Sequence, residues 1–141
     1  WRKELRPDSG GNGKQRGGLG QYMEVGAQAG HEFDFQAMFD RVNHPANGRA
    51  GGGAGAPTTI QQDDGTPMNG KGKQFVPNGR KVIMAFPGGA GYGEAKDRSL
   101  DQVKRDLLRG YISIETAAEY YGLNKEDVDE VQKAIENGKD F

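Results

Sequence analysis

The sequence has no cysteine, which excludes a disulfide framework and a thiolate metal site. Histidine is scarce as well, because only His31 and His44 are present, and they lack the i, i+4 spacing of a metal-binding pair. No cluster of acidic residues flanks either histidine at ligand spacing. His44 lies just before Pro45 in a predicted loop, where we expect it to be exposed. We therefore expect no metal site made by this chain alone.

Long apolar runs are also absent. Hydrophobic residues make up 33% of the chain, and no stretch approaches the roughly 20 apolar residues of a membrane span. No signal peptide is visible in the sequence. The net charge of -1 gives no general attraction to nucleic acid or to an anionic membrane. We expect a cytoplasmic protein that binds neither.

The residue types that commonly carry catalysis form no recognisable constellation. Ser9 precedes Gly10, but the sequence has no G-x-S-x-G nucleophile elbow and no histidine with an evident reason to reach this serine. Asp63 and Asp64 precede Gly65, a pattern typical of a turn rather than of paired catalytic carboxylates. We therefore assign no catalytic residue to this chain.

Glycine is what the chain has in excess, with 24 residues among 141. Each glycine costs conformational entropy on folding and buries no side chain, so the sequence offers a poor basis for an independent core. The sequence also opens at Trp1 rather than at a methionine. We interpret it as a piece of something larger, cut from a precursor or split off as a subunit, and we expect other chains to shape its glycine loops.

The glycines divide the chain into two parts. Twenty-one of them precede residue 94 and three follow it. We therefore expect a glycine-rich β region over residues 1–95 and a small helical tail over residues 96–141, together an α+β fold.

Alternating apolar and polar residues predict strands in the first part. We expect two half-buried strands between residues 20 and 38 with a turn at Ala29-Gly30, and further strands at residues 58–61, 73–76 and 80–86. Residues 82–86 are apolar throughout, so we expect this strand to be buried on both faces. Between the strands, residues 43–58 form a long loop, and loops of this length are usually functional or disordered.

Three amphipathic helices are predicted in the tail. Their expected N-caps are Ser99, which with Gln102 forms a capping box, then Ser113 and Asn124, and their terminating residues are Gly110, Gly122 and Gly138. The inward faces are expected to consist of Leu100, Val103 and Leu107, of Ile114, Ala117, Ala118 and Tyr121, and of Val128, Val131, Ala134 and Ile135. Residues 113–134 have the outline of a helix-turn-helix. However, residues 111–141 carry eight acidic and three basic side chains, which phosphates would repel.

The first glycine loop, residues 5–20, can be read in two ways. It is too rich in glycine for a helix or an ordinary strand, and Leu5 and Leu19 provide apolar anchors at its ends. It matches neither a phosphate-binding P-loop nor a dinucleotide fingerprint. Only glycine fits if the loop is a buried crossing, whereas Lys14 and Arg16 could instead contact an anionic ligand or a carboxylate on a partner. The candidate substrate-region or packing residues are Ser9, Gly10, Gly11, Gly13, Lys14, Arg16, Gly17 and Gly18.

A second tight glycine loop follows the last predicted strand at residues 87–93. Its candidate residues are Gly88, Gly89, Gly91, Tyr92 and Gly93. Tyr92 could stack on a ligand, although an aromatic residue among glycines more often fills a gap over a turn.

Three ordered motifs resemble the hydantoinase B/oxoprolinase family over nearly the whole chain. The first is L-R-P-D-S-G-G-N-G-K-Q-R-G-G-L-G at residues 5–20, and the second is P-G-G-A-G-Y-G at residues 87–93, where Ala90 replaces a glycine of the usual run. The third comprises Asp97, residues 103–106, G-Y-I-S at residues 110–113, Ala117-Ala118 and Tyr121-Gly122. The chain resembles only the C-terminal part of a normally much longer subunit.

This resemblance implies part of a larger multi-subunit, ATP-dependent enzyme. A hydantoinase A-like partner subunit would bind ATP and Mg and hydrolyse the nucleotide. The N-terminal part of the hydantoinase B-like subunit would hold a divalent metal and handle the small-molecule substrate. Members of the family open cyclic amides such as hydantoins, 5-oxoproline or lactams, and close relatives carboxylate acetone or acetophenone. The resemblance leaves three roles open: part of a cyclic-amide hydrolase, part of a ketone carboxylase, or a non-catalytic structural piece.

Overall fold

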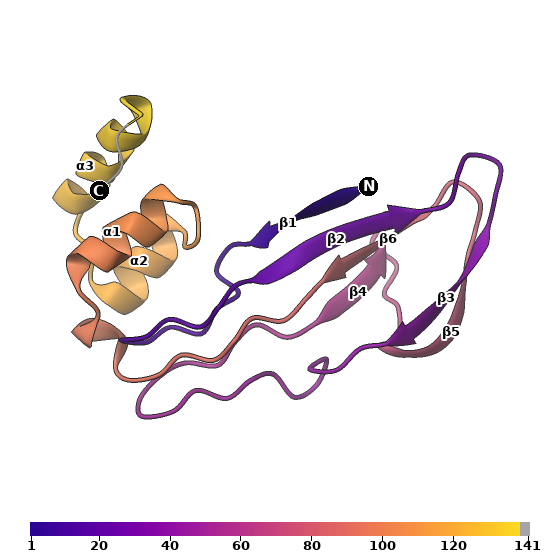
Figure 1. The fold of residues 1–141 in the computed structure, drawn as a ribbon, viewed down its shortest axis with the longest axis horizontal. Coiled ribbons are helices and arrows are strands. Elements are labelled where there is room, and N and C mark those ends of the chain that lie inside the picture. The colour runs from indigo at the N-terminus through magenta and orange to yellow at the C-terminus, as the bar shows by residue number, and fades with distance from the viewer. Residues whose placement is uncertain (139–141) are drawn as a thin grey trace.

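The computed structural model describes residues 1–138 and shows an elongated molecule (Figure 1). The helical tail lies at one end, the strands lie toward the other, and glycine-rich segments run lengthwise between them. Antiparallel sheets and three α-helices confirm the predicted α+β fold.

The main sheet has four antiparallel strands in the order β1-β2-β6-β4. Their bounds are Arg2–Arg6 for β1, Gly20–Gly26 for β2, Lys81–Ala85 for β6 and Thr59–Gln62 for β4. Strands β2, β4 and β6 confirm the predictions, and β6 is largely buried as expected. Strand β1 was not predicted, and Leu5, expected to be an apolar anchor, is 48% exposed on it.

A second, two-stranded sheet extends beyond the main one (Figure 1). Strand β3 (Phe33–Met38) pairs antiparallel with β5 (Lys71–Val76). Both were predicted as strands, although β5 begins two residues earlier than expected. The turn at Ala29-Gly30 is present, and Gly30 has a φ of +89°, but β2 and β3 belong to different sheets.

One hydrophobic core joins the two sheets. Its buried members are Ile60, Val76, Val82 and Met84, with partly buried phenylalanines packed around them. The ring of Phe39 lies 5.7 Å from that of Phe86 and 6.1 Å from that of Phe35, measured between centroids, so the aromatic side chains form a continuous contact.

The helical tail has its own core. It contains a short 3₁₀ turn, η1 (Ala95–Asp97), and the helices α1 (Leu100–Leu108), α2 (Ile114–Tyr121) and α3 (Lys125–Glu136). Their contact is built by the buried residues Val103, Leu107, Ile112, Ala117, Tyr121, Leu123, Val128 and Val131. None of the helices within residues 1–138 is long and apolar enough to cross a membrane.

Two of the three predicted caps are confirmed. The side chain of Ser113 accepts a hydrogen bond from the Thr116 N–H at 3.1 Å, and that of Asn124 accepts one from Asp127 at 2.9 Å. The Ser99 side chain makes no capping bond, so the predicted capping box is wrong, although Ser99 is the N-cap residue.

Parts of the predicted inward faces also proved wrong. Four residues assigned to them are exposed: Leu100, Ile114, Ala118 and Ile135. Each helix packs against few neighbours. The buried stripe on each helix is therefore narrower than the predicted one.

Candidate functional site

Three glycine-rich segments meet between the main sheet and the helical tail. They are residues 9–20, 43–58 and 87–93, which we call the glycine layer. Main-chain bonds join all three, since Gly11 N–H donates to Gly89 at 2.8 Å and Gly91 N–H donates to Gly53 at 2.9 Å. The Gly53 N–H in turn donates to the Asn12 carbonyl at 2.6 Å. Residues 43–58 are thus the long loop that was predicted, and it is tied into this layer.

Most positions in the glycine layer have no room for a side chain. A Cβ atom on Gly17 would overlap the carbonyl oxygen of Gly89, and one on Gly88 would overlap that of Ser9. The same backbone overlap would arise at Gly10, Gly11, Gly52, Gly55 and Gly91. Gly18 differs, because no atom lies within 4 Å of its would-be Cβ. Glycine is required here because one main chain touches another directly.

This packing corrects the expectation that other chains shape the glycine loops. The atoms that exclude a Cβ at these positions belong to the chain itself, in another segment of the layer or, for Gly10, in the same segment. The two loops noted in the sequence therefore fit each other, with residues 43–58 as the third member.

Ser9 is a buried structural contact. Its hydroxyl donates to the Arg6 carbonyl at 2.5 Å and accepts from the Gly20 N–H at 2.8 Å, so both ends of the first loop are tied together. A hydroxyl engaged in this way closes the loop and is not presented to solvent.

Three polar residues of the first loop, spaced four apart, contact the helical tail. Asp8, with a φ of +57°, donates its N–H to the Tyr111 carbonyl at 3.0 Å and accepts from the Ser113 N–H at 2.9 Å. Asn12 accepts from the Tyr121 hydroxyl at 3.2 Å. Burial raises the pKa of the Tyr121 phenol, so the group stays protonated and able to donate.

Arg16 is the third contact, and it belongs to a buried ion cluster centred on Asp106. Its Nε donates to Asp106 at 2.9 Å, and Arg98 donates to the same carboxylate at 2.8 Å. The side chains of Arg16, Arg98 and Asp106 are only 12%, 10% and 10% exposed. The Arg16 guanidinium also lies 5.6 Å from the Tyr111 ring centroid.

This geometry narrows the role expected of Arg16. The sequence left an anionic ligand and a carboxylate on a partner as its possible contacts. The carboxylate is supplied by Asp106 of the same chain, 90 residues away. Lys14, by contrast, remains exposed.

Asp106 was missed in the sequence, although a signal was present. It lies between Val103 and Leu107 on the inward stripe of α1, where an unpaired carboxylate would be costly. A carboxylate at such a position indicates a buried cation opposite, but the partner cannot be named from spacing alone.

Tyr92 is held by main-chain bonds, and the residue is 59% exposed. It exchanges two main-chain bonds with Gln15, each of 2.9 Å, and it bridges Arg49 on the other side. An exposed residue of this kind does not fill a gap over a turn.

No catalytic constellation can be assembled from these contacts. Within residues 1–138, no group of three or more His, Asp or Glu side chains could hold a metal ion. What the arrangement supplies is a rigid main-chain layer that the helical tail fastens from one side.

Comparison with known proteins gives a consistent family. Residues 1–95 match the model of the family described as hydantoinase B/oxoprolinase. The B subunit of a putative D-/L-hydantoinase from Pseudomonas sp. (strain NS671) is 30% identical over 136 residues, which cover 92% of this chain and 23% of that protein. The beta subunit of caprolactamase from Pseudomonas jessenii is 29% identical over 134 residues, covering 86% of this chain and 22% of that protein.

Solved structures show the same relationship. The crystal structure of the ATP-dependent caprolactamase from Pseudomonas jessenii matches with a TM-score of 0.73 and 26% identity, over 96% of this chain and 25% of that one. A nucleotide-free acetone carboxylase matches with a TM-score of 0.66 and 17% identity, over 96% of this chain and 24% of that one, which shows a shared fold. The chain spans 21–23% of the length of the curated relatives it matches.

Proposed function

Because the chain belongs to the hydantoinase B/oxoprolinase family, we propose that it forms the C-terminal part of an ATP-dependent enzyme that hydrolyses a cyclic amide. One observation carries the proposal: the caprolactamase of Pseudomonas jessenii is similar in sequence and in structure along most of this chain. Caprolactam is a cyclic amide, and that enzyme is ATP-dependent. Hydantoins, oxoproline and lactams are the substrate classes to test.

The chemistry is proposed to lie mostly outside these residues. We propose that a hydantoinase A-like subunit binds ATP and Mg and that the N-terminal part of the B-like subunit holds a divalent metal. The A-like subunit and the N-terminal part of the B-like subunit are the proposed partners of this chain, in a cytoplasmic complex. The naming of the two Pseudomonas relatives as subunits supports a role within an assembly.

Within that assembly, we propose that residues 9–20 support the substrate region. The loop is rigid because Ser9 ties its two ends together, and because Asn12 and Arg16 are bonded to the helical tail. A rigid layer can hold neighbouring catalytic groups in place. Arg16 acts here through the position of the loop and not by touching substrate, so we class it as a positioning residue.

The proposal is tested on the complete natural protein purified with its partner subunits. We expect ATP consumption when a lactam or hydantoin is supplied and ring-opened product in the same tube. ATP consumption only with a ketone and bicarbonate would refute cyclic-amide hydrolysis and support a ketone carboxylase, the alternative favoured by the shared fold with acetone carboxylase.

A third role, that of a structural piece without influence on turnover, makes a different prediction. In that case Arg16→Ala should leave turnover by the intact complex unchanged. We expect this variant to lower kcat while the complex still assembles. Circular dichroism of the isolated chain adds a second measurement, because a cooperative melt would identify residues 1–141 as an autonomous domain.

A further inference from the structure

Strand β1 forms an edge of the main sheet that has no partner among residues 1–138. It pairs with β2 alone in this range, and residues 1–5 are all exposed. The opposite edge, at β4, is covered by residues 66–68, where the Met68 N–H donates to the Ile60 carbonyl at 2.9 Å. Proteins usually protect the edges of their sheets, so an open edge is a place where a further strand can add.

The register of the sheet shows which main-chain groups point out of this edge. Residues directly opposite each other in an antiparallel pair alternately exchange main-chain bonds and face away from each other. The Phe86 N–H donates to the Gln21 carbonyl at 2.7 Å, so the main-chain groups of Gln21 face β6. Leu5 lies opposite Gln21, and its own N–H and C=O therefore point out of the sheet. The same holds for Lys3, two residues earlier.

The charged side chains of β1 lie mostly on one face, where they already have partners. Arg2 forms an ion pair with Glu4, and Arg6 donates to two main-chain carbonyls of the same chain. The guanidinium groups of Arg2 and Arg6 also lie over the Tyr22 ring, each 5.8 Å from its centroid. This face of the strand is satisfied without any further contact.

The other face of β1 is apolar and uncovered. Lys3 lies opposite Met23, whose side chain packs against the core, so this face continues the core face of the sheet. Leu5 is nevertheless 48% exposed and Trp1 is 92% exposed. An apolar groove of about 270 Å³ runs beside them, and its lining includes Trp1, Lys3, Met23 and Val25. The Lys3 ammonium makes no ion pair or hydrogen bond with the residues that the structure describes.

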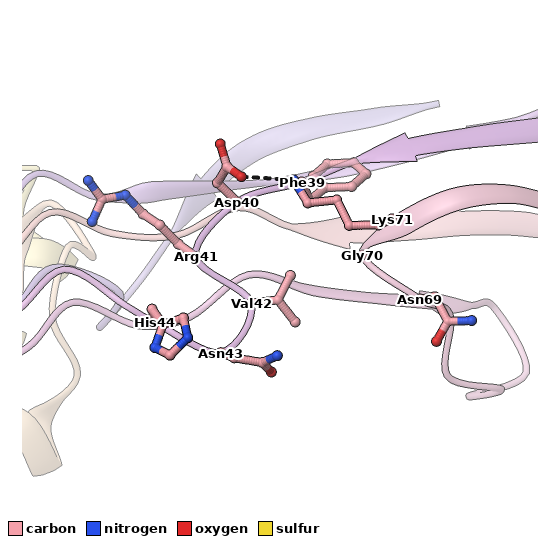
Figure 2. A pocket seen from close by; sticks show the side chains of 9 residues that line it. All are labelled: Phe39, Asp40, Arg41, Val42, Asn43, His44, Asn69, Gly70 and Lys71. Atoms are coloured by element: carbon pink, nitrogen blue, oxygen red, sulfur yellow. Dashed lines mark hydrogen bonds and ion pairs between the residues drawn. The ribbon is translucent and has the colours of Figure 1, made fainter.

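The two-stranded sheet that covers the rest of the core face is fixed in its place. The ring of Phe39, which follows β3, lies 5.7 Å from that of Phe86, and the Phe39 N–H donates to the Gly70 carbonyl at 2.8 Å. Figure 2 shows the chain that leaves β3 beside the chain that enters β5, with Asp40 and Lys71 joined by an ion pair. This sheet cannot move over β1 without breaking these contacts, so a cover for β1 has to come from elsewhere.

We propose that a β-strand from the N-terminal part of the same B-like subunit adds to β1 and covers its apolar face. The proposal rests on the proposed function, in which these residues form the C-terminal part of such a subunit. The chain spans 21–23% of the length of its curated relatives, so a protein of that length has ample polypeptide to supply the strand. The main-chain groups of Lys3 and Leu5 bond to the added strand. Its apolar side chains lie over Leu5 and the groove, and one of its carboxylates pairs with Lys3.

The size of the edge favours a strand from the same polypeptide over a second copy or a separate subunit. A strand of five residues is about 17 Å long. Two molecules that met only along this edge would bury far less than the roughly 1,200 Å² of a stable interface. A strand that belongs to the same polypeptide is present at a high effective concentration, so it needs no interface of that size.

Amide hydrogen exchange in the complete natural protein with its partner subunits tests whether the edge is paired. Amides that point into solvent exchange near their intrinsic rates. We expect the amides of Lys3 and Leu5 to exchange at least about 100-fold more slowly than that. The Glu4 amide points toward β2 and serves as the internal control, protected with or without an added strand. Unprotected amides at Lys3 and Leu5 would overturn the proposal.

Photo-crosslinking identifies what covers the face. A benzophenone side chain is placed at position 5 in the complete protein, in a preparation that mixes isotope-labelled and unlabelled copies. We expect crosslinks to a segment that precedes Trp1 in the same copy. Crosslinks to a second copy, or to the A-like subunit, would overturn the assignment.

A charge reversal tests the pairing of Lys3. Lys3→Glu sets two carboxylates against each other, and we expect the Leu5 amide to exchange about tenfold faster in this variant. Lys96→Glu is the matched control, because it reverses an exposed lysine of η1 that makes no ion pair with the residues described. Equal exchange of the Leu5 amide in both variants would contradict the pairing.

Cyclic-amide turnover is measured separately on the same preparation, so the two proposals can fail independently. A protected edge with same-copy crosslinks in a protein without such turnover would uphold the added strand and refute the proposed reaction. Turnover in a protein whose Lys3 and Leu5 amides are unprotected would do the reverse.

Discussion

In the glycine layer, main chains pack directly on main chains, whereas in the helical tail side chains fill the space between helices. The layer gains its contacts from hydrogen bonds such as Gly11 to Gly89 and Gly91 to Gly53. The tail gains its contacts from buried apolar residues such as Val103 and Val131. The two regions therefore differ in what they tolerate: the layer depends on the absence of side chains, and the tail depends on their presence.

The largest expected effect comes from adding one methyl group to the layer. Gly17→Ala places a Cβ against the Gly89 carbonyl oxygen, where both neighbours are main chain and cannot rotate away. Overpacking a core typically costs about 1–3 kcal/mol, and we expect about 3 kcal/mol or more here because the obstacle is backbone. Thermal unfolding measures this loss as a lower Tm.

Gly18→Ala is the matched control for that variant. It adds the same methyl group one residue later, where no atom lies within 4 Å, so we expect a change within about 0.5 kcal/mol. Equal Tm values for the two variants would show that the main chains of the layer can move apart to accept a side chain. The proposed difference between the glycine layer and the helical tail would then be wrong.

This contrast also explains which features could be read from the sequence. The three helices and strands β2 to β6 were predicted, because periodicity and caps are local signals. Strand β1 was missed because R-K-E-L-R contains a single apolar residue, and β1 exists through its pairing with β2. Local patterns carry no information about such a partner.

The candidate site shows the same limit. Glycine content marked residues 5–20 and 87–93 as special, since density of glycine is visible in the sequence. Which backbone approaches which glycine is set by contacts between distant segments, as with Gly11 and Gly53. The Arg16–Asp106 pair spans 90 residues, so the arginine could be selected as a candidate while its partner could not.

The next largest effect is expected where the two regions are fastened together. Asp106→Asn leaves the buried guanidinium groups of Arg16 and Arg98 without their shared carboxylate. Breaking a buried ion pair from one side typically costs about 3–5 kcal/mol, and we expect about 3 kcal/mol because a carboxamide still accepts hydrogen bonds. Denaturant unfolding provides the measurement.

Arg16→Ala should cost less than Asp106→Asn, because Arg98 still pairs with the carboxylate in that variant. An order opposite to this one would indicate that the stacking of Arg16 on Tyr111 matters more than the ion cluster.

A truncation in the tail core should have a smaller effect than either change. Val131→Ala removes buried methyl groups from α3 and should cost about 2 kcal/mol, because helices can partly close around the space. On the same helix, Ile135 is 53% exposed, so Ile135→Ala should change stability by less than about 0.5 kcal/mol. Unfolding curves for the pair test whether side-chain burial holds the tail together. Similar losses at both positions would contradict that account.

The smallest expected effect concerns pH, and it should again separate the two regions. In the tail, Lys104 of α1 bridges Asp127 and Glu130 of α3, each at 2.7 Å. The Lys104 hydrogen bond lowers the pKa of Asp127. A carboxyl group with a lowered pKa in the folded state stabilises it above the ordinary aspartate value of about 4, and this contribution is lost as pH falls through the lowered pKa. The main-chain bonds of the glycine layer do not titrate.

Amide hydrogen exchange can follow this difference residue by residue. As pH is lowered below about 4, we expect the amides of α3 to lose protection before those of Gly11, Gly89 and Gly91, after correction for intrinsic exchange rates. Lys104→Met should remove the acid-dependent part of the loss of protection in α3, because protonation of Asp127 then breaks no ion pair with residue 104. Glu126→Gln alters an exposed acid of the same helix that makes no ion pair with the residues described, so its profile should follow the wild type. If the glycine layer and α3 lost protection together in every variant, the two regions would open as one unit, and their different packing would not translate into different stability.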